Sequence, residues 1–174
     1  MVEGWFFLSA ALLLVSGGAK LRDPAPTAGA LRAATLPSGR PLVFLLAAGE
    51  TIVGAGALLL GGRVFGWLLA GLYAGFAGFV AVALRRRLPI ASCGCFGKTD
   101  TPPSLFHLVL NLAAMGGGIR AAIAPSRPLV GALAGQPLLG IPYLAFLAIG
   151  TFLAYLVLSD LPRLVRPVTG PVAR

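Results

Sequence analysis

Residues 64 to 84 form a stretch of 21 amino acids that contains no charged side chain. A helix rises about 1.5 Å per residue, so a helical stretch of this length crosses about 30 Å, the thickness of the hydrocarbon core of a bilayer. An uninterrupted apolar run of this length is typical of a transmembrane helix. The sequence therefore predicts that this segment crosses a membrane.

The rest of the chain has the composition of a membrane protein. Hydrophobic residues make up 57% of its 174 positions and charged residues 11%, whereas about 25% of an average soluble domain is charged. The long apolar runs predict about five spans, at residues 2–21, 42–61, 64–84, 104–124 and 138–158. The expected fold class is all-α, a polytopic transmembrane helical bundle with a four-helix core plus one span. We expect one membrane domain over residues 1–160 and a basic C-terminal tail over residues 161–174.

One carboxylate interrupts the second span. Glu50 lies about nine residues into the run, at a depth of about 13 Å if the run is helical. A charged group is costly at this depth, and an intramembrane ionisable residue marks a functional or paired site by default. Lys20, near the end of the first span on the same side of the membrane, is a candidate partner. The alternative is a protonated Glu50 that donates a hydrogen bond to a neighbouring helix.

The connection between the first two spans is polar and contains Pro24 and Pro26, which cannot continue a helix. Residues 27–36 are expected to form either a short amphipathic helix on the membrane surface, with Leu31 and Leu36 inward, or a disordered loop.

Glycines at positions 71, 75 and 78 of the third span share one side of the helix. Small residues at this spacing allow two membrane helices to approach closely. The pattern predicts a helix-packing face.

Both cysteines of the chain lie in one short polar loop, as Cys93-Gly94-Cys95. A disulfide joins Cα atoms about 4.4–6.8 Å apart, so an i,i+2 pair must bend its backbone to close the ring. Gly94 makes such a bend accessible. Strained disulfides are the more oxidising ones and are typical of labile or catalytic pairs. The alternatives are a soft-metal site and two small apolar side chains.

The fourth span carries His107 and Asn111 on one face, because they are four residues apart. His107 follows the cysteine loop closely, and a histidine there can lower a thiol pKa or carry a proton. The alternative is a structural histidine that hydrogen-bonds to lipid headgroups or to the backbone. Together with Glu50, His107 is a candidate for proton transfer.

Five spans place the first connection, the cysteine loop and the tail on one side of the membrane. That side carries eleven of the 14 Lys and Arg residues, and the other carries Arg63, Arg120 and Arg127. The positive-inside rule then predicts a multi-pass protein of the inner (plasma) membrane, with its N-terminus outside and its C-terminus in the cytoplasm. Contact with the lipid bilayer explains the net charge of +9, so no nucleic-acid partner is expected.

Three stretches resemble the MauE/DoxX group of bacterial membrane proteins. Residues 16–24, Ser-Gly-Gly-Ala-Lys-Leu-Arg-Asp-Pro, look like the end of that group's first span, and Glu50 followed by Gly54 and Gly56 looks like its second. The sequence Cys-Gly-Cys-Phe-Gly at residues 93–97, after a basic cluster, is similar to the cysteine motif of the MauE branch. The resemblance extends over roughly residues 4 to 160.

This resemblance implies an inner-membrane protein tied to redox chemistry, with Cys93 and Cys95 as the redox pair. MauE itself belongs to methylamine utilisation, where it is thought to work with a thioredoxin-like partner in maturing a disulfide-rich periplasmic subunit. A periplasmic partner requires thiols on the outer side, whereas the charge count places them inside. Relay of electrons from a cytosolic thioredoxin outward would reconcile the two.

Three functions stay open on the sequence alone. The first is a component of a membrane thiol–disulfide oxidoreductase, in which Cys93 and Cys95 exchange with a thioredoxin-like protein and a quinone is a conceivable cofactor. The second is binding or transport of a soft metal such as Cu(I), although the chain has only two methionines. The third is a structural subunit with incidental cysteines.

Overall fold

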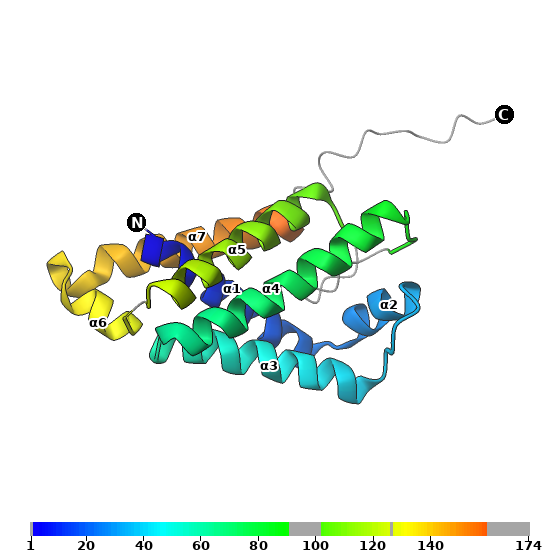
Figure 1. The fold of residues 1–174 in the computed structure, drawn as a ribbon, viewed down its shortest axis with the longest axis horizontal. Coiled ribbons are helices and arrows are strands. Elements are labelled where there is room, and N and C mark those ends of the chain that lie inside the picture. Colours follow the sequence, from blue (N-terminus) through cyan, green and yellow to red (C-terminus); the bar gives the residue numbers. More distant parts are fainter. Residues whose placement is uncertain (1, 91–101, 126, 160–174) are drawn as a thin grey trace.

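The computed structural model describes residues 2–90, 102–125 and 127–159. Within these ranges the chain is helical and contains no strand. The elements are α1 (Val2–Arg22), α2 (Ala25–Ala33), α3 (Arg40–Leu59), α4 (Gly62–Arg85), α5 (Leu105–Ile123), α6 (Leu129–Ala134), the 3₁₀ turn η1 (Pro137–Gly140) and α7 (Ile141–Ser159). Five of these helices, α1, α3, α4, α5 and α7, are long and apolar enough to cross a membrane (Figure 1). The all-α class and the five spans are confirmed.

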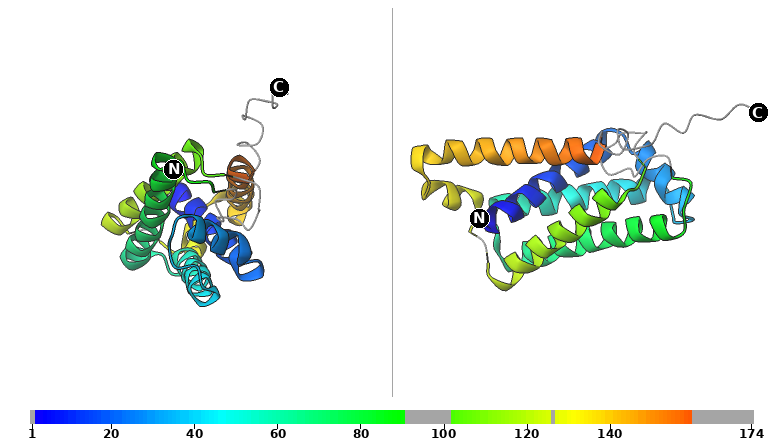
Figure 2. Two further views of the ribbon diagram at one scale, coloured as in Figure 1. Left: turned by 90° about the vertical axis from the view of Figure 1, so that its right-hand side faces the viewer. Right: turned by 90° about the horizontal axis from the view of Figure 1, so that it is seen from above.

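The five long helices run side by side and alternate in direction (Figures 1 and 2). The closest pairs are α1 with α3 and α4 with α5, and α1 also packs against α5 and α7. In α1, 56% of the most apolar stretch of the helix is buried inside the bundle, against 11% in α7. The bundle is therefore a four-helix core with α1 at its centre and α7 as a peripheral fifth span.

Glycines let α1 and α3 approach closely enough for side chains to meet between them. A Cβ atom added at Gly54 would lie 2.8 Å from both the carbonyl oxygen of Ala10 and the backbone nitrogen of Leu14. A Cβ atom added at Gly17 of α1 would likewise lie 2.8 Å from the Ala47 carbonyl oxygen of α3. Because backbone atoms cannot move aside cheaply, only glycine fits these positions.

Helices α3 and α4 form a hairpin that opens toward one end of the bundle. They meet at Gly61, whose φ of 63° favours glycine. From this turn the two helices diverge, and α2 lies in the gap between their far ends (Figure 1). The space between α3 and α4 is therefore a wedge that widens toward α2 (Figure 1).

Helix α2 shows that the first connection contains a short helix, and the two leucines predicted to face inward, Leu31 and Leu36, both line the space between α2 and α4. The buried residues of α2 are Pro26, Thr27 and Ala30, whereas Leu31 is half-buried and Leu36 is 47% exposed. The helix ends at Ala33, so Leu36 lies in the following turn and not on the helical face. Small side chains face the bundle because α2 sits close to its neighbours.

The prediction that Gly71, Gly75 and Gly78 pack against a neighbouring helix is wrong for the described residues of this chain. All three glycines are exposed, and an added Cβ atom would meet no atom within 4 Å. The close approach of α4 to α5 uses Gly66 and Gly118 instead, where an added Cβ would lie within 2.9 Å of backbone atoms. Small-residue spacing identifies a narrow face but does not say which neighbour covers it.

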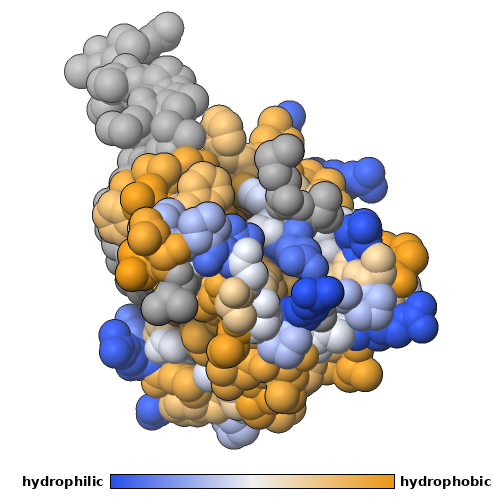
Figure 3. Space-filling view, turned by 90° about the vertical axis from the view of Figure 1, so that its left-hand side faces the viewer, coloured by the Kyte–Doolittle hydropathy of each residue, from blue (hydrophilic) through white to orange (hydrophobic). Residues whose placement is uncertain are grey.

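The two ends of the bundle differ in charge. Lys20, Arg22, Arg40 and residues 85–87 lie at the end where α1 and α4 finish and α3 begins. At the opposite end, hydrophilic side chains gather over the middle of the face and hydrophobic ones surround them (Figure 3). Exposed apolar side chains such as Leu45, Ile52 and Val109 line the sides of the helices. An apolar belt between polar ends is the surface expected of a membrane-spanning bundle.

Candidate functional site

A buried ion pair lies inside the bundle, between α1 and α3. The Lys20 ammonium donates a hydrogen bond to Oε2 of Glu50 over 2.8 Å. The Lys20 side chain is 3% exposed and that of Glu50 is fully buried. The proposed partner of Glu50 is therefore confirmed, because the structure places these two side chains in direct contact.

Ser16 completes a three-membered polar cluster with this pair. Its hydroxyl donates to Glu50 Oε2 over 2.8 Å and accepts from Lys20 Nζ over 2.6 Å. Ser16 and Lys20 are four residues apart on α1, so they lie on the same face of the helix. The sequence reasoning missed Ser16, since a serine in a membrane helix gives no signal of its own.

The environment of Glu50 makes the cluster chemically unusual. A buried ion pair must offset a large desolvation cost, so unpaired oxygen atoms are expected to be rare there. Yet Oε1 of Glu50 is buried, and no atom of the described residues hydrogen-bonds to it. Oε1 of the carboxylate can therefore accept a proton or a hydrogen bond from a water molecule.

His107 lies in the first turn of α5 and is buried in the bundle. It is 2% exposed, and its Nδ1 lies 2.8 Å from the hydroxyl of Ser104. The ring also hydrogen-bonds to the main chain of Leu158 in α7. His107 is therefore an interior residue, and its hydrogen bonds within the protein fit the structural alternative as well as a role in proton transfer.

A small cavity lies between the polar cluster and His107. Its volume is about 30 Å³, enough for one or two water molecules. Ser16, Tyr73, His107 and Asn111 contribute polar side chains to its lining. Ser16 thus hydrogen-bonds to Glu50 and also lines the cavity. Of the two residues predicted for proton transfer, His107 lines this mostly apolar cavity, and Glu50 is connected to it through Ser16.

Cys93 and Cys95 lie outside the described residues. The chain is described up to Ile90 and again from Pro102. Ile90 is buried against Ala30 of α2 and Ala83 of α4. Pro102 precedes the first turn of α5, the turn that holds His107. Both flanks of the cysteine segment therefore belong to the basic end of the bundle, from which Glu50 is ten residues away along α3.

The fold and this site define a polytopic helical membrane protein with an ion pair buried among its spans. The family model for methylamine utilisation protein MauE matches residues 4–125, and the chain belongs to this family. The matched region contains α1 to α5, the whole four-helix core, and ends before α6 and α7. Comparisons with curated proteins and with solved structures gave no match.

Proposed function

We propose that this protein takes part in thiol–disulfide exchange through Cys93 and Cys95. In this proposal the pair alternates between dithiol and disulfide and exchanges with a thioredoxin-like protein through a mixed disulfide. Membership of the MauE family and the presence of both cysteines in one Cys-Gly-Cys loop support it. The three arginines at positions 85–87 and Lys98 favour the thiolate form in that loop.

The observation that carries the proposal is the polar cluster of Ser16, Lys20 and Glu50 inside the bundle. Oxidation of two thiols to a disulfide releases two electrons and two protons. Glu50 has a buried acceptor oxygen with no partner among the described residues, and Ser16 links it to the cavity beside His107. These groups supply acceptor and donor positions for protons inside an otherwise apolar bundle.

The pathway and the orientation are further parts of this proposal. Methylamine utilisation is the process that the family description names, and maturation of an exported protein is the role that we propose within it. The basic end of the bundle would face the cytoplasm of a cell with this protein in its inner membrane, which leaves the N-terminus outside.

Trapping of the mixed disulfide tests the exchange. Membranes that contain the full chain, or its Cys93→Ser, Cys95→Ser or double variant, are incubated with a thioredoxin that lacks its resolving cysteine. We expect a reductant-sensitive adduct with the chain and with at least one single variant, and none with the double variant. Absence of any adduct, or an equal adduct in the double variant, would contradict the proposal.

The same variants separate the two alternatives. If a Cu(I) chelator abolishes activity in cells that depend on this protein, soft-metal binding by the cysteine pair replaces thiol exchange. If the double variant retains full activity, the cysteines are incidental and the protein acts as a structural subunit.

A further inference from the structure

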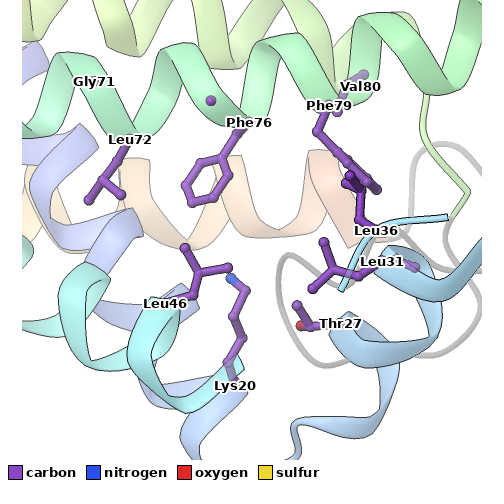
Figure 4. Close-up of a pocket in the computed structure, with 12 residues that line it drawn as sticks. Lys20, Thr27, Leu31, Leu36, Leu46, Gly71, Leu72, Phe76, Phe79 and Val80 are labelled. Atoms are coloured by element: carbon purple, nitrogen blue, oxygen red, sulfur yellow. The ribbon is translucent and has the colours of Figure 1, made fainter. Parts of the chain in front are cut away.

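A second, larger cavity lies in the wedge between α3 and α4. Its volume is about 300 Å³, which is at the lower end of the range for sites that bind small molecules. Its walls are apolar side chains of α4, α3 and α2, among them Phe76, Phe79, Leu46 and Leu31 (Figure 4). Lys20 from α1 is the one charged residue among its described lining.

The cavity is open to the lipid side of the bundle. Gly71 and Gly75 line it and are exposed, and both lie well inside a helix that crosses the membrane. Gly75 is ten residues from the end of α4 at Arg85, which corresponds to a depth of about 15 Å. A molecule that enters at this depth must already be dissolved in the bilayer.

The charges at the cavity indicate what kind of polar group it accepts. Lys20 extends toward Phe76, and its Nζ lies 5.6 Å from the centroid of that ring (Figure 4). Glu50 neutralises Lys20 at 2.8 Å, so an anionic ligand would bring an uncompensated negative charge into hydrocarbon. The negative end of a carbonyl dipole is attracted by the ammonium without adding net charge.

The aromatic side chains indicate the shape of the ligand. Phe76 and Phe79 are three residues apart on α4, and both line the cavity. Flat rings pack favourably against aromatic side chains in offset or edge-to-face arrangements. The combination of a flat ring, a neutral carbonyl and solubility in lipid describes a quinone.

We propose that the wedge between α3 and α4 binds the ring of a lipid-soluble quinone, with its carbonyl directed at the Lys20–Glu50 pair and its tail among the lipids. This inference concerns binding alone and stands apart from the chemistry of the cysteines. The Lys20–Glu50 pair would then hold α1 against α3 and would also recognise the carbonyl oxygen of a neutral ligand.

The test measures binding of decylubiquinone to the purified full chain in nanodiscs of saturated phosphatidylcholine. Gly75→Leu and, separately, Gly71→Leu fill the cavity, because an added side chain at either position enters open space. Gly78→Leu is the matched control, since it is equally exposed on α4 but does not line the cavity. We expect saturable binding to the unmodified chain and the control, and at least about tenfold weaker binding to the two cavity variants, a loss of about 1.4 kcal/mol.

Two further ligands test the chemistry. Decylbenzene has a flat six-membered ring and the same decyl chain but no carbonyls, and palmitate has a chain and a negative charge. We expect both to compete at least about tenfold more weakly than decylubiquinone. Equal competition by decylbenzene or palmitate would overturn carbonyl recognition and make the cavity a lipid-chain site. Equal binding to all three leucine variants, checked for native helix content by circular dichroism, would overturn the site itself.

The Cys93→Ser, Cys95→Ser double variant separates this inference from the proposed function. Quinone binding is expected to be unchanged in it, so a failure of thiol exchange would leave the binding result intact. Conversely, loss of binding in Gly75→Leu with normal disulfide trapping would show that the two are independent.

Discussion

Lys20 Nζ lies 2.8 Å from Glu50 Oε2, across a separation of 30 residues and between two membrane-spanning helices. The contact fixes the rotation of α1 against α3, because both side chains are buried and each would be costly alone. It also places Lys20 at the larger cavity, while Ser16, which contacts both members of the pair, lines the smaller one.

Removal of one partner should therefore destabilise the bundle far more than removal of both. Lys20→Met removes the cation beside Glu50, and Glu50→Gln removes the anion beside Lys20, so each is expected to cost about 3 kcal/mol or more. The Lys20→Met, Glu50→Gln double variant should recover most of that loss. A double-mutant cycle, measured by unfolding in mixed detergent and followed by circular dichroism, gives the coupling energy. Additive losses would mean that the pair contributes nothing as a pair.

Ser16 is expected to stabilise this pair in a way that an ordinary helix serine does not. Ser16→Ala removes a donor to Glu50 and an acceptor for Lys20, and should cost about 1–3 kcal/mol. Ser9→Ala is the matched control, because Ser9 is buried on the same helix and its hydroxyl donates to the Trp5 carbonyl one turn before it. That change should alter stability by about 0.5 kcal/mol or less. Equal losses in the two variants would contradict a special role for Ser16.

The pairing of Lys20 with Glu50 could be predicted from the sequence because charge in an apolar span carries a large energetic penalty. Helix positions followed for a similar reason, since a span needs about 20 apolar residues, and the expected ends differ from those observed by at most three residues. The role of Ser16 and the cavity beside His107 could not be predicted, because both depend on the rotation of helices about their axes. Helix α6 was missed since six apolar residues are too few to give a periodic signal.

The glycines show most clearly that the sequence does not predict which face of a helix contacts a neighbour. Gly71, Gly75 and Gly78 have the spacing of a packing face but meet nothing, whereas Gly17 and Gly54 hold α1 against α3. The spacing is a property of one helix, and the contact is a property of two. Only the arrangement in space distinguishes a glycine that faces a neighbouring backbone from one that faces lipid.

This distinction yields a stability prediction. Gly54→Ala puts a methyl group 2.8 Å from two backbone atoms of α1, and such overpacking typically costs about 1–3 kcal/mol. Gly49→Ala, on the same helix, meets no atom within 4 Å and should stabilise by up to about 1 kcal/mol, because alanine has the higher helix propensity. Unfolding of both variants in mixed detergent measures the difference. A loss in Gly49→Ala as large as that in Gly54→Ala would contradict the assigned helix interface.

The proposed orientation predicts which end of the bundle is accessible from outside the cell. In a background without Cys93 and Cys95, Arg86→Cys at the basic end should react with an impermeant maleimide only after lysis. Arg127→Cys, at the opposite end, should react in intact cells. The reverse pattern would place the basic end outside and reverse the direction of the positive-inside bias.

We expect Glu50 and His107 to act in one path for protons. If Ser16 and the 30 Å³ cavity connect these two residues in one path, either Glu50→Gln or His107→Gln blocks it and should slow disulfide formation by about 10²-fold, the scale of one lost acid–base step. The double variant should then be no slower than the slower single variant, because a path that is already blocked cannot be blocked again. Rates are measured by thiol trapping in water and in deuterium oxide, with a solvent isotope effect expected for the unmodified chain. Asn111→Ala, which changes the cavity lining without removing a titratable group, is the control and should retain most of the rate. Multiplicative losses in the double variant would show that Glu50 and His107 act separately, with Glu50 serving the helix contact alone.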